Sequence, residues 1–462
     1  MHLPPSPSTI LKNARQIVLF LLFLLGAQTA IAFHSTPAKA VSLIRDAEIE
    51  RILRGYATPI FAAAGLNPKA VNIYLVRDNN INAFVAGGQN VFFTTELLLK
   101  FDSPAEIKGV IAHEVGHIAG GHLARTRDAL TGASATSIAA FILGVGAAIA
   151  GQPDIGVGIL AGGSHVAQRN FLTYSRTQEA SADQAALSYL EIIGESGQGL
   201  VEVLQSFGNQ EALNVKNQDP FVRSHPLSRD RIGAIERRVK ASPYYEKAEP
   251  QEAIEAHLRM QGKLYGFVKR PDQTLRKFPP SDTSVKARYA RVAAYHLASN
   301  ETAAHQEIAA LIAEDPRNPY YHELQGQIYF EHGHVQKAIA PYAKSVELAP
   351  EEPLLRVNLA QAMLAGENPE YNAAALENLE WAMRQDPEIL IGWHQLAIAY
   401  ARNDQNGMAS LASAERYSRA GARQEAVLHA KRALHNLPEG SPGWLRAQDI
   451  IETGKSNRKQ RG

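Results

Sequence analysis

The 462-residue chain lacks cysteine altogether and carries almost no net charge. Without a thiol it forms no disulfide and cannot be a lipoprotein, so an exported form must depend on packing and metal binding. A formal charge of +1 argues against nucleic acid as a partner, since phosphate backbones select strongly basic proteins. Extensive disorder is excluded as well, because 45% hydrophobic residues can fill real cores, and the length allows two or three domains.

The first 32 residues have the composition of an export signal. Lys12 and Arg15 precede an apolar run over 17–25, which is too short to span a bilayer comfortably, and the sequence Ala-Ile-Ala at 30–32 suits a cleavage site. We expect cleavage there, with 38–40 as a second possibility. Removal of two basic residues and no acidic one changes the formal charge from +1 to −1. These features predict a bacterial periplasmic protein, and secretion is the alternative.

One short motif specifies chemistry, the HExxH sequence at residues 113–117. Four residues of an α-helix make about one turn, so His113 and His117 leave the same face and can bind one zinc ion. Glu114 then points at the water that the zinc ion activates. Apolar residues surround the motif, and the sequence from Ser103 onward has the pattern of a capped helix start. The pattern favours a buried zinc-peptidase helix over a helix that merely carries two solvent-facing histidines.

A catalytic zinc ion needs a third protein ligand and an open fourth position. His122 is near in sequence, but in a continuous helix it points away from the ligand face, so we expect it to be structural or at the surface. The better candidate is Glu179, which opens a second helical stretch with Asp183 at i+4. One carboxylate can bind zinc while the other orients a ligand, although an acidic, solvated helix start has the same pattern.

Several motifs in one order resemble the zinc metallopeptidase family that includes HtpX and the CAAX prenyl proteases. They are the strand-like sequence over 82–93, HExxH at 113–117, Glu179 with Asp183, and Ser224-His225-Pro226 followed by Arg231-Ile232. The resemblance covers about residues 45–240, although the family's multiple membrane-spanning helices are not evident. It implies that His113, His117 and Glu179 bind one zinc ion per subunit, that Glu114 is the general base, and that Asp183 orients the ligands.

The implied reaction is hydrolysis of a peptide bond. Zinc polarises the scissile carbonyl and lowers the pKa of its water, while Glu114 takes the proton and passes it to the leaving amine. The stretch 89–95, rich in β-formers and preceded by two glycines, predicts an edge strand that pairs with an extended substrate. Because backbone pairing reads shape rather than sequence, we expect weak side-chain specificity.

Two further features suggest regulation and membrane contact. His225, beside a proline, leaves two roles open: it could occupy the fourth zinc position as an inhibitory ligand, or it could stabilise the oxyanion or merely pack. The stretch 133–163 is almost uncharged, rich in Gly and Ala, and broken by Pro153. It fits a membrane hairpin, a re-entrant element or a buried helical hairpin. We favour a partly exposed hairpin that covers the zinc site or touches the outer membrane.

Prolines mark a repeat in the C-terminal half. Pro316 and Pro350 lie 34 residues apart, which is the length of a tetratricopeptide repeat. The 37 residues from Pro350 to Pro387 indicate a three-residue insertion, and the 51 residues from Pro387 to Pro438 leave room for one extra helix. We expect helical hairpins over about 285–440 that form a superhelix. Its concave groove would hold a substrate or a partner, and a rigid scaffold is the alternative.

Together these patterns predict an α-rich α+β chain, with a mainly helical gluzincin-type metallopeptidase domain, a small β-sheet and an all-α tetratricopeptide solenoid. The expected parts are a signal peptide at 1–32, the metallopeptidase domain at 33–241, a linker with a helix at 242–284, the repeat domain at 285–453 and a disordered basic tail at 454–462.

The combination of an exported zinc peptidase with such repeats resembles a family of periplasmic quality-control endopeptidases of Gram-negative bacteria. That resemblance implies action on unfolded or misassembled polypeptides, a chaperone-like role in assembling outer-membrane β-barrel proteins, and contact with the assembly machinery. Two alternatives remain. One is a non-proteolytic export chaperone or adaptor with a structural zinc site, and the other is an intramembrane metalloprotease.

Overall fold

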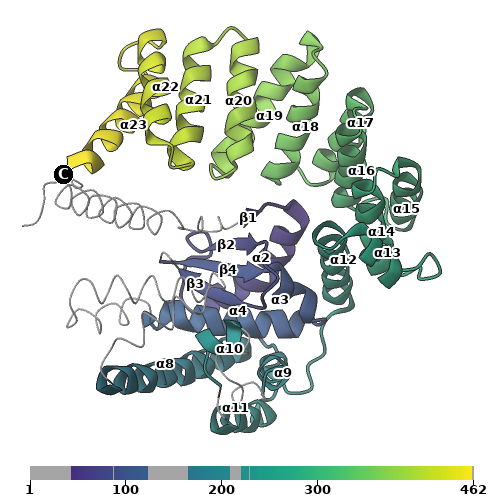
Figure 1. The fold of residues 1–462 in the computed structure, drawn as a ribbon, viewed down its shortest axis with the longest axis vertical. Coiled ribbons are helices and arrows are strands. Elements are labelled where there is room, and N and C mark those ends of the chain that lie inside the picture. The colour runs from purple at the N-terminus through teal and green to yellow at the C-terminus, as the bar shows by residue number, and fades with distance from the viewer. Residues whose placement is uncertain (1–42, 87, 123–164, 209–219, 228, 460–462) are drawn as a thin grey trace, which may run out of the picture. The chain divides into compact units, whose positions relative to one another are not determined.

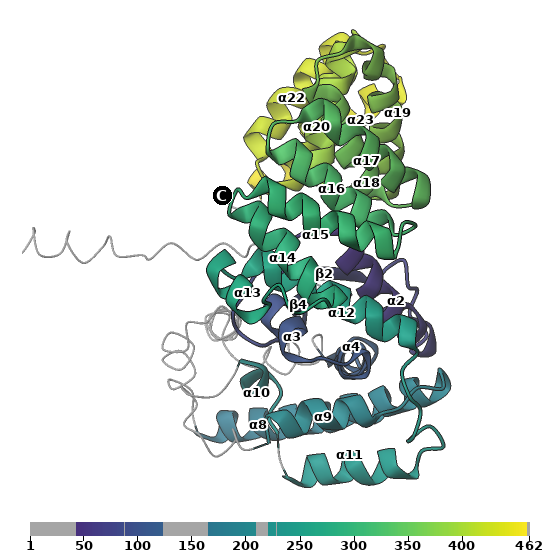
Figure 2. The same ribbon diagram turned by 90° about the vertical axis from the view of Figure 1, so that its right-hand side faces the viewer.

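The computed structural model describes residues 43–86, 88–122, 165–208, 220–227 and 229–459 (Figures 1 and 2). The expected export signal and the apolar stretch 133–163 lie outside the described residues. Among the helices that are described, none has both the length and the apolar character to cross a bilayer. The described chain is mainly helical with one small sheet, which confirms the predicted fold class.

The described sheet has four strands in the order β1-β2-β4-β3. They are β1 (Leu43–Ile44), β2 (Asn72–Val76), β3 (Ala83–Ala86) and β4 (Asn90–Thr94), of which β2 and β4 are parallel and the other pairs antiparallel. The prediction of an edge strand at 89–95 is therefore wrong, because β4 lies between β2 and β3. Gly88, at φ 98°, turns β3 back onto one side of β4, and β2 pairs with the other side.

Seven helices accompany this sheet in the described part of the chain, and one of them, α4, carries the HExxH motif. They are α2 (Ala47–Ala63), α3 (Thr95–Lys100), α4 (Pro104–Ala119), α8 (His165–Ile192), α9 (Gln198–Ser206), α10 (Pro220–Ser224) and α11 (Arg229–Ala241). Helix α4 packs against α2, α8, α9 and β3. Two glycines permit this close approach: a Cβ added to Gly116 would lie 2.7 Å from the carbonyl oxygen of Ala182 on α8, and one added to Gly199 would lie 2.2 Å from the backbone of Ala105. Small residues thus allow both α8 and α9 to approach α4 closely.

The stretch 242–284, expected to be a linker with a helix, contains α12 (Gln251–Val268) and α13 (Pro271–Lys277). Met260 and Leu264 of α12 belong to the same hydrophobic core as α2 and α4. His257 and Gln261 donate hydrogen bonds to the carbonyl oxygen of Phe101, at 2.8 and 2.9 Å. Helix α12 is therefore packed into the peptidase part and does not hang between two domains.

From residue 285 the chain forms antiparallel helix pairs, shown in green to yellow in Figure 1. They are α14 (Val285–Leu297), α15 (Glu301–Glu314), α16 (Pro319–Glu331), α17 (Val335–Leu348), α18 (Pro353–Ala365), α19 (Asn372–Gln385), α20 (Leu390–Arg402), α21 (Asn406–Arg419), α22 (Arg423–Asn436) and α23 (Pro442–Lys459). The small 3₁₀ turn η3 (Pro369–Tyr371) follows α18 and lies between Pro350 and Pro387, the stretch with the predicted insertion. Helix α23 continues to Lys459, so the expectation of a disordered tail is wrong for residues 454–459.

A buried ion cluster joins the helix pairs to the peptidase part. Nζ of Lys263, whose side chain is 2% exposed, lies 2.8 Å from Asp46 and 3.3 Å from Glu323 of α16. The hydroxyl of Tyr289 donates to Glu48, which lies in the first turn of α2, and Asp46 is the N-cap of this helix. Burial raises the pKa of Glu48, and the charge of Lys263 opposes that rise. One cation thus compensates carboxylates from both parts of the chain.

Candidate metal centre

The HExxH motif lies on α4, and the start of this helix follows the predicted pattern. Ser103 caps the helix and forms a reciprocal capping box with Glu106, while Pro104 is the first helical residue. One turn apart on the same face, His113 and His117 are buried, with 2% and 9% exposure. The helix therefore presents both imidazoles to the interior of the protein.

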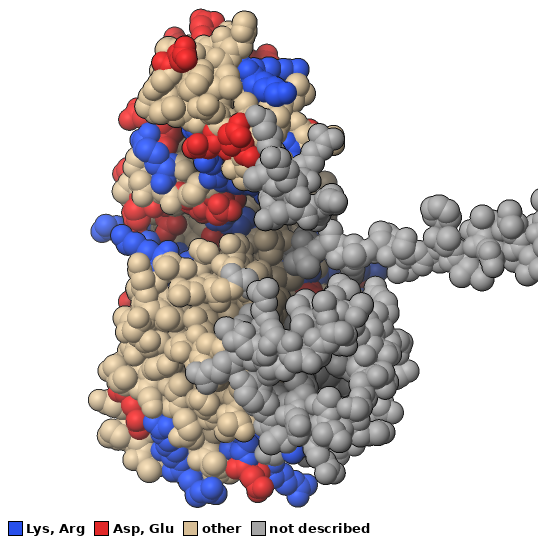
Figure 3. All heavy atoms as spheres, turned by 90° about the vertical axis from the view of Figure 1, so that its left-hand side faces the viewer, with Lys and Arg blue, Asp and Glu red and all other residues tan. Residues whose placement is uncertain are grey.

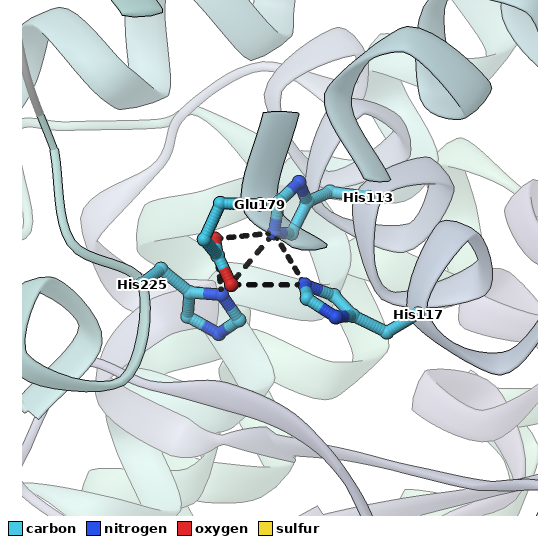
Figure 4. Close-up of side chains that lie close together, drawn as sticks. All are labelled: His113, His117, Glu179 and His225. Atoms are coloured by element: carbon cyan, nitrogen blue, oxygen red, sulfur yellow. Dashed lines mark hydrogen bonds and ion pairs between the residues drawn. The ribbon is translucent and has the colours of Figure 1, made fainter. Parts of the chain in front are cut away.

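Glu179 reaches these histidines from α8. Its carboxylate oxygens lie 3.3 Å from Nε2 of His113 and 3.2 Å from Nε2 of His117, and the two Nε2 atoms are 3.1 Å apart (Figure 4). Donors that bind zinc at about 2.0–2.2 Å in tetrahedral geometry lie roughly 3.3–3.6 Å from one another. The three side chains therefore fit a zinc ion and leave one of its positions to another group.

His225, between α10 and α11, is at that remaining position. Its Nδ1 lies 3.1 Å from both Nε2 of His113 and Oε2 of Glu179, and the donor atoms of the four residues all lie within 4.8 Å of one another. Its Nε2 lies 3.3 Å from Oε1 of Glu114. The sequence named His225 as a residue of the site, and in the structure its ring lies in the group of metal donors (Figure 4).

Asp183 and Arg231 orient the expected metal ligands: Asp183 contacts His113, and Arg231 contacts Asp183 and Glu179. Nδ1 of His113 donates to Asp183 at 2.9 Å, and Arg231 donates to both carboxylate oxygens of Asp183, at 2.5 and 2.8 Å. Burial alone would raise the pKa of Asp183, but the hydrogen bonds from Arg231 and His113 outweigh it and lower that pKa. Burial is likewise outweighed at Glu179, where the charge of His225 and hydrogen bonds from the histidines hold the pKa well below its usual range. Both acids are thus anionic near neutral pH, as metal binding requires.

Glu114 is 1% exposed and faces the same group of donors. Among the described residues its Oε1 has no hydrogen-bond partner, although Nε2 of His225 lies 3.3 Å away. A buried carboxylate oxygen without a donor is costly, and a water molecule beside the metal would satisfy it. This position suits a residue that accepts a proton from such a water.

His122 is the site residue that sequence reasoning missed. It was expected to be structural or at the surface, yet it is 4% exposed and its Nδ1 lies 3.0 Å from Nδ1 of His117. The expectation assumed a continuous helix, whereas α4 ends at Ala119 and Gly121, at φ 60°, turns the chain back. The paired glycines at 120 and 121 were the signal that the helix ends before residue 122, so that helical spacing does not give the direction of the His122 side chain. With Nε2 of His117 facing the metal, Nδ1 can donate to His122, which then fixes the ring.

One family model and several known proteins are similar to this chain. Residues 43–239 match the model of Peptidase family M48. The Beta-barrel assembly-enhancing protease of Yersinia pestis is 25% identical over 389 residues, which cover 83% of this chain and 79% of that protein. The protein of the same name from Escherichia coli (strain K12) is 23% identical over 403 residues, covering 86% and 81%. Metalloprotease LoiP of Escherichia coli (strain K12) is 29% identical over 179 residues, covering 38% and 66%.

Proposed function

We propose that the chain, whose residues 43–239 match the model of Peptidase family M48, is a zinc-dependent endopeptidase of the bacterial periplasm. Its substrates are misfolded or stalled exported proteins. The observation that carries this proposal is the convergence of Glu179 on His113 and His117 beside the buried carboxylate of Glu114. Two imidazoles and one carboxylate are a donor set of catalytic zinc sites, and a structural site has no use for a general base.

The roles of the residues follow from their contacts. A zinc ion held by His113, His117 and Glu179 would polarise the scissile carbonyl and acidify the attacking water. Glu114 accepts the proton of that water and delivers it to the leaving amine. Asp183 accepts the Nδ1 proton of His113, so that Nε2 of this ring keeps its lone pair toward the metal.

His225 acts in this proposal as an inhibitory ligand. Its Nδ1 lies as close to Nε2 of His113 as the Nε2 of His117 does, 3.1 Å in each case, which supports a fourth donor rather than a distant neighbour. An imidazole in the position needed by water keeps hydrolysis at a low basal rate until the loop after α10 moves. Stabilisation of the oxyanion is the alternative role, and it requires the ring to leave the metal but remain beside the substrate.

The helix pairs supply a second proposed role, which is assistance in protein assembly. Two relatives carry a name that refers to enhanced β-barrel assembly, and each matches more than four fifths of this chain. We therefore extend the proposal to a chaperone-like role in the assembly of outer-membrane β-barrel proteins, with the repeats at 285–453 contacting the assembly machinery or its substrates. The peptidase domain at 33–241 carries the chemistry, and α12 within 242–284 packs into the hydrophobic core of that domain.

One comparison tests the enzymatic proposal. Purified mature protein is analysed for zinc and incubated with casein, in parallel with Glu114→Gln. We expect one zinc ion per chain in both proteins and cleavage by the wild type alone, because glutamine retains the shape of the side chain but accepts no proton. Cleavage by Glu114→Gln would refute the role of this residue. Absence of zinc, or of cleavage by the wild type, would favour the non-proteolytic adaptor instead.

A further inference from the structure

Three aromatic rings form a row across the small sheet. Tyr74 on β2, Phe92 on β4 and Phe84 on β3 are in register with one another. The ring of Phe92 stacks on that of Tyr74 with centroids 5.0 Å apart and 19° between the planes, and on that of Phe84 with centroids 4.9 Å apart and 8° between the planes. The row therefore repeats at about the spacing of neighbouring strands, which is roughly 4.7–4.9 Å.

This aromatic row lies on the face of the sheet that is turned away from the hydrophobic core. Side chains alternate along a strand, and the neighbours Leu75 and Phe93 are buried in the core at 2% and 0% exposure. Tyr74, Phe92 and Phe84 point the other way and are each half-buried. Within the described chain β3 pairs with β4 only, so the row ends at Phe84.

The outer edge of β3 faces the metal centre. The carbonyl oxygen of Asn82 accepts from the backbone N–H of Thr94, so residues 82, 84 and 86 direct their backbone groups to β4. Ala83 directs its own groups the opposite way, and its carbonyl oxygen lies 3.4 Å from Nε2 of His225. The edge that presents Ala83 and Val85 is therefore the one beside the metal donors.

We propose that Phe84 gives the peptidase a preference for an aromatic residue at one subsite near the scissile bond. The proposal rests on the proposed function. A substrate that adds as an antiparallel strand to the edge of β3 bonds to the backbone of Ala83 and Val85. Its residue opposite Phe84 then forms a non-hydrogen-bonded pair, in which facing side chains approach most closely. An aromatic ring there continues the row by one more step.

Two features favour a ring over other side chains at this subsite. The row presents the face of Phe84, which is held nearly parallel to Phe92 and so is fixed for offset stacking. Seen from the side on which β3 lies in Figure 1, the described surface at the level of the sheet carries few acidic or basic side chains (Figure 3). The described part of this face therefore gives no support for selection by charge, and the expectation of weak side-chain specificity changes to a preference at one position.

Mapping the cleavage sites in casein by mass spectrometry tests the proposal. For the wild type we expect enrichment of Phe, Tyr and Trp at one fixed position relative to the cleaved bond. Matched peptides with Phe or Leu at that position should differ roughly two- to tenfold in kcat/KM. Phe84→Leu, which keeps an apolar side chain but removes the ring, should abolish the difference. Tyr74→Leu is the control, because it removes a ring of the same row two strands away from the edge.

Each result has a distinct meaning. Cleavage by the wild type without aromatic enrichment overturns this inference and leaves the proposed function intact. Enrichment that survives in Phe84→Leu, or that is lost equally in Tyr74→Leu, also overturns it. If the wild type cleaves nothing, the proposed function fails and the subsite fails with it.

Discussion

The packing of α12 into the peptidase part predicts a specific loss of stability in acid. His257 of α12 is fully buried, and its Nε2 donates to the carbonyl oxygen of Phe101. Its Nδ1 is buried and has no partner among the described residues, so a proton on that nitrogen would have no acceptor. Burial lowers the pKa of His257 to about 4, although the hydrogen bond to Phe101 opposes the change. The folded protein therefore keeps this ring neutral.

The sign and size of the effect follow from that shift. In the unfolded chain the ring titrates near pH 6.5. Between pH 6.5 and pH 4 the unfolded state therefore binds a proton at this ring, whereas the ring in the folded state stays neutral. Stability is present above pH 6.5 and is lost as the pH falls through this window. With these two pKa values, the loss amounts to about 2 kcal/mol on going from pH 7 to pH 5, and to about 3 kcal/mol below pH 4.

The perturbation is His257→Gln, whose amide can donate to Phe101 but does not titrate. Stability at pH 7 and pH 5 is measured by amide hydrogen exchange of α12, because exchange reports the opening of this helix even if the repeats unfold separately. We expect the wild type to lose about 2 kcal/mol more than the variant between the two pH values.

His435→Gln is the matched control, since it removes an exposed histidine from α22 and should leave the pH dependence of the wild type unchanged. An equal loss in the wild type and in His257→Gln would refute the reasoning. It would mean that α12 does not bury a neutral imidazole against Phe101 and that the segment behaves as a linker after all.

Two further predictions concern the metal centre. His225→Ala should raise the basal rate of casein cleavage without lowering the zinc content, because three protein ligands remain and the fourth position opens; an unchanged or lower rate would contradict the inhibitory role. In Gly116→Ala the new Cβ would lie 2.7 Å from the carbonyl oxygen of Ala182, so α8 must move away from α4. This movement should destabilise the protein by about 1–3 kcal/mol. It should also lower zinc retention, because Glu179 is on α8. Chelator competition and urea unfolding measure both effects. Gly55→Ala, in an exposed position of α2 with no atom within 4 Å of the new Cβ, should instead stabilise the protein by up to about 1 kcal/mol, and destabilisation there would question the packing argument.

The sequence by itself determined the features that depend on near neighbours in the chain. Helical periodicity placed His113, Glu114 and His117 on one helix, and the capping pattern located its start within a residue. The spacing of prolines predicted helix pairs, including the extra helix before Pro438, because each pair is a local unit that repeats. The repeat spacing, together with the resemblance to the metallopeptidase family, also predicted a mainly helical chain with a small sheet, as the structure shows.

Only the tertiary structure decided which distant segments meet. The choice between β3 and β4 as the edge strand depends on where β2 pairs, and no local pattern records that partner. His122 contacts His117 because the helix ends at two glycines and the chain turns back. Helix α12 belongs to the core because its apolar face packs against α2 and α4. Local preferences are set by a few bonds along the chain, whereas these contacts arise from burying apolar surface between segments far apart in sequence.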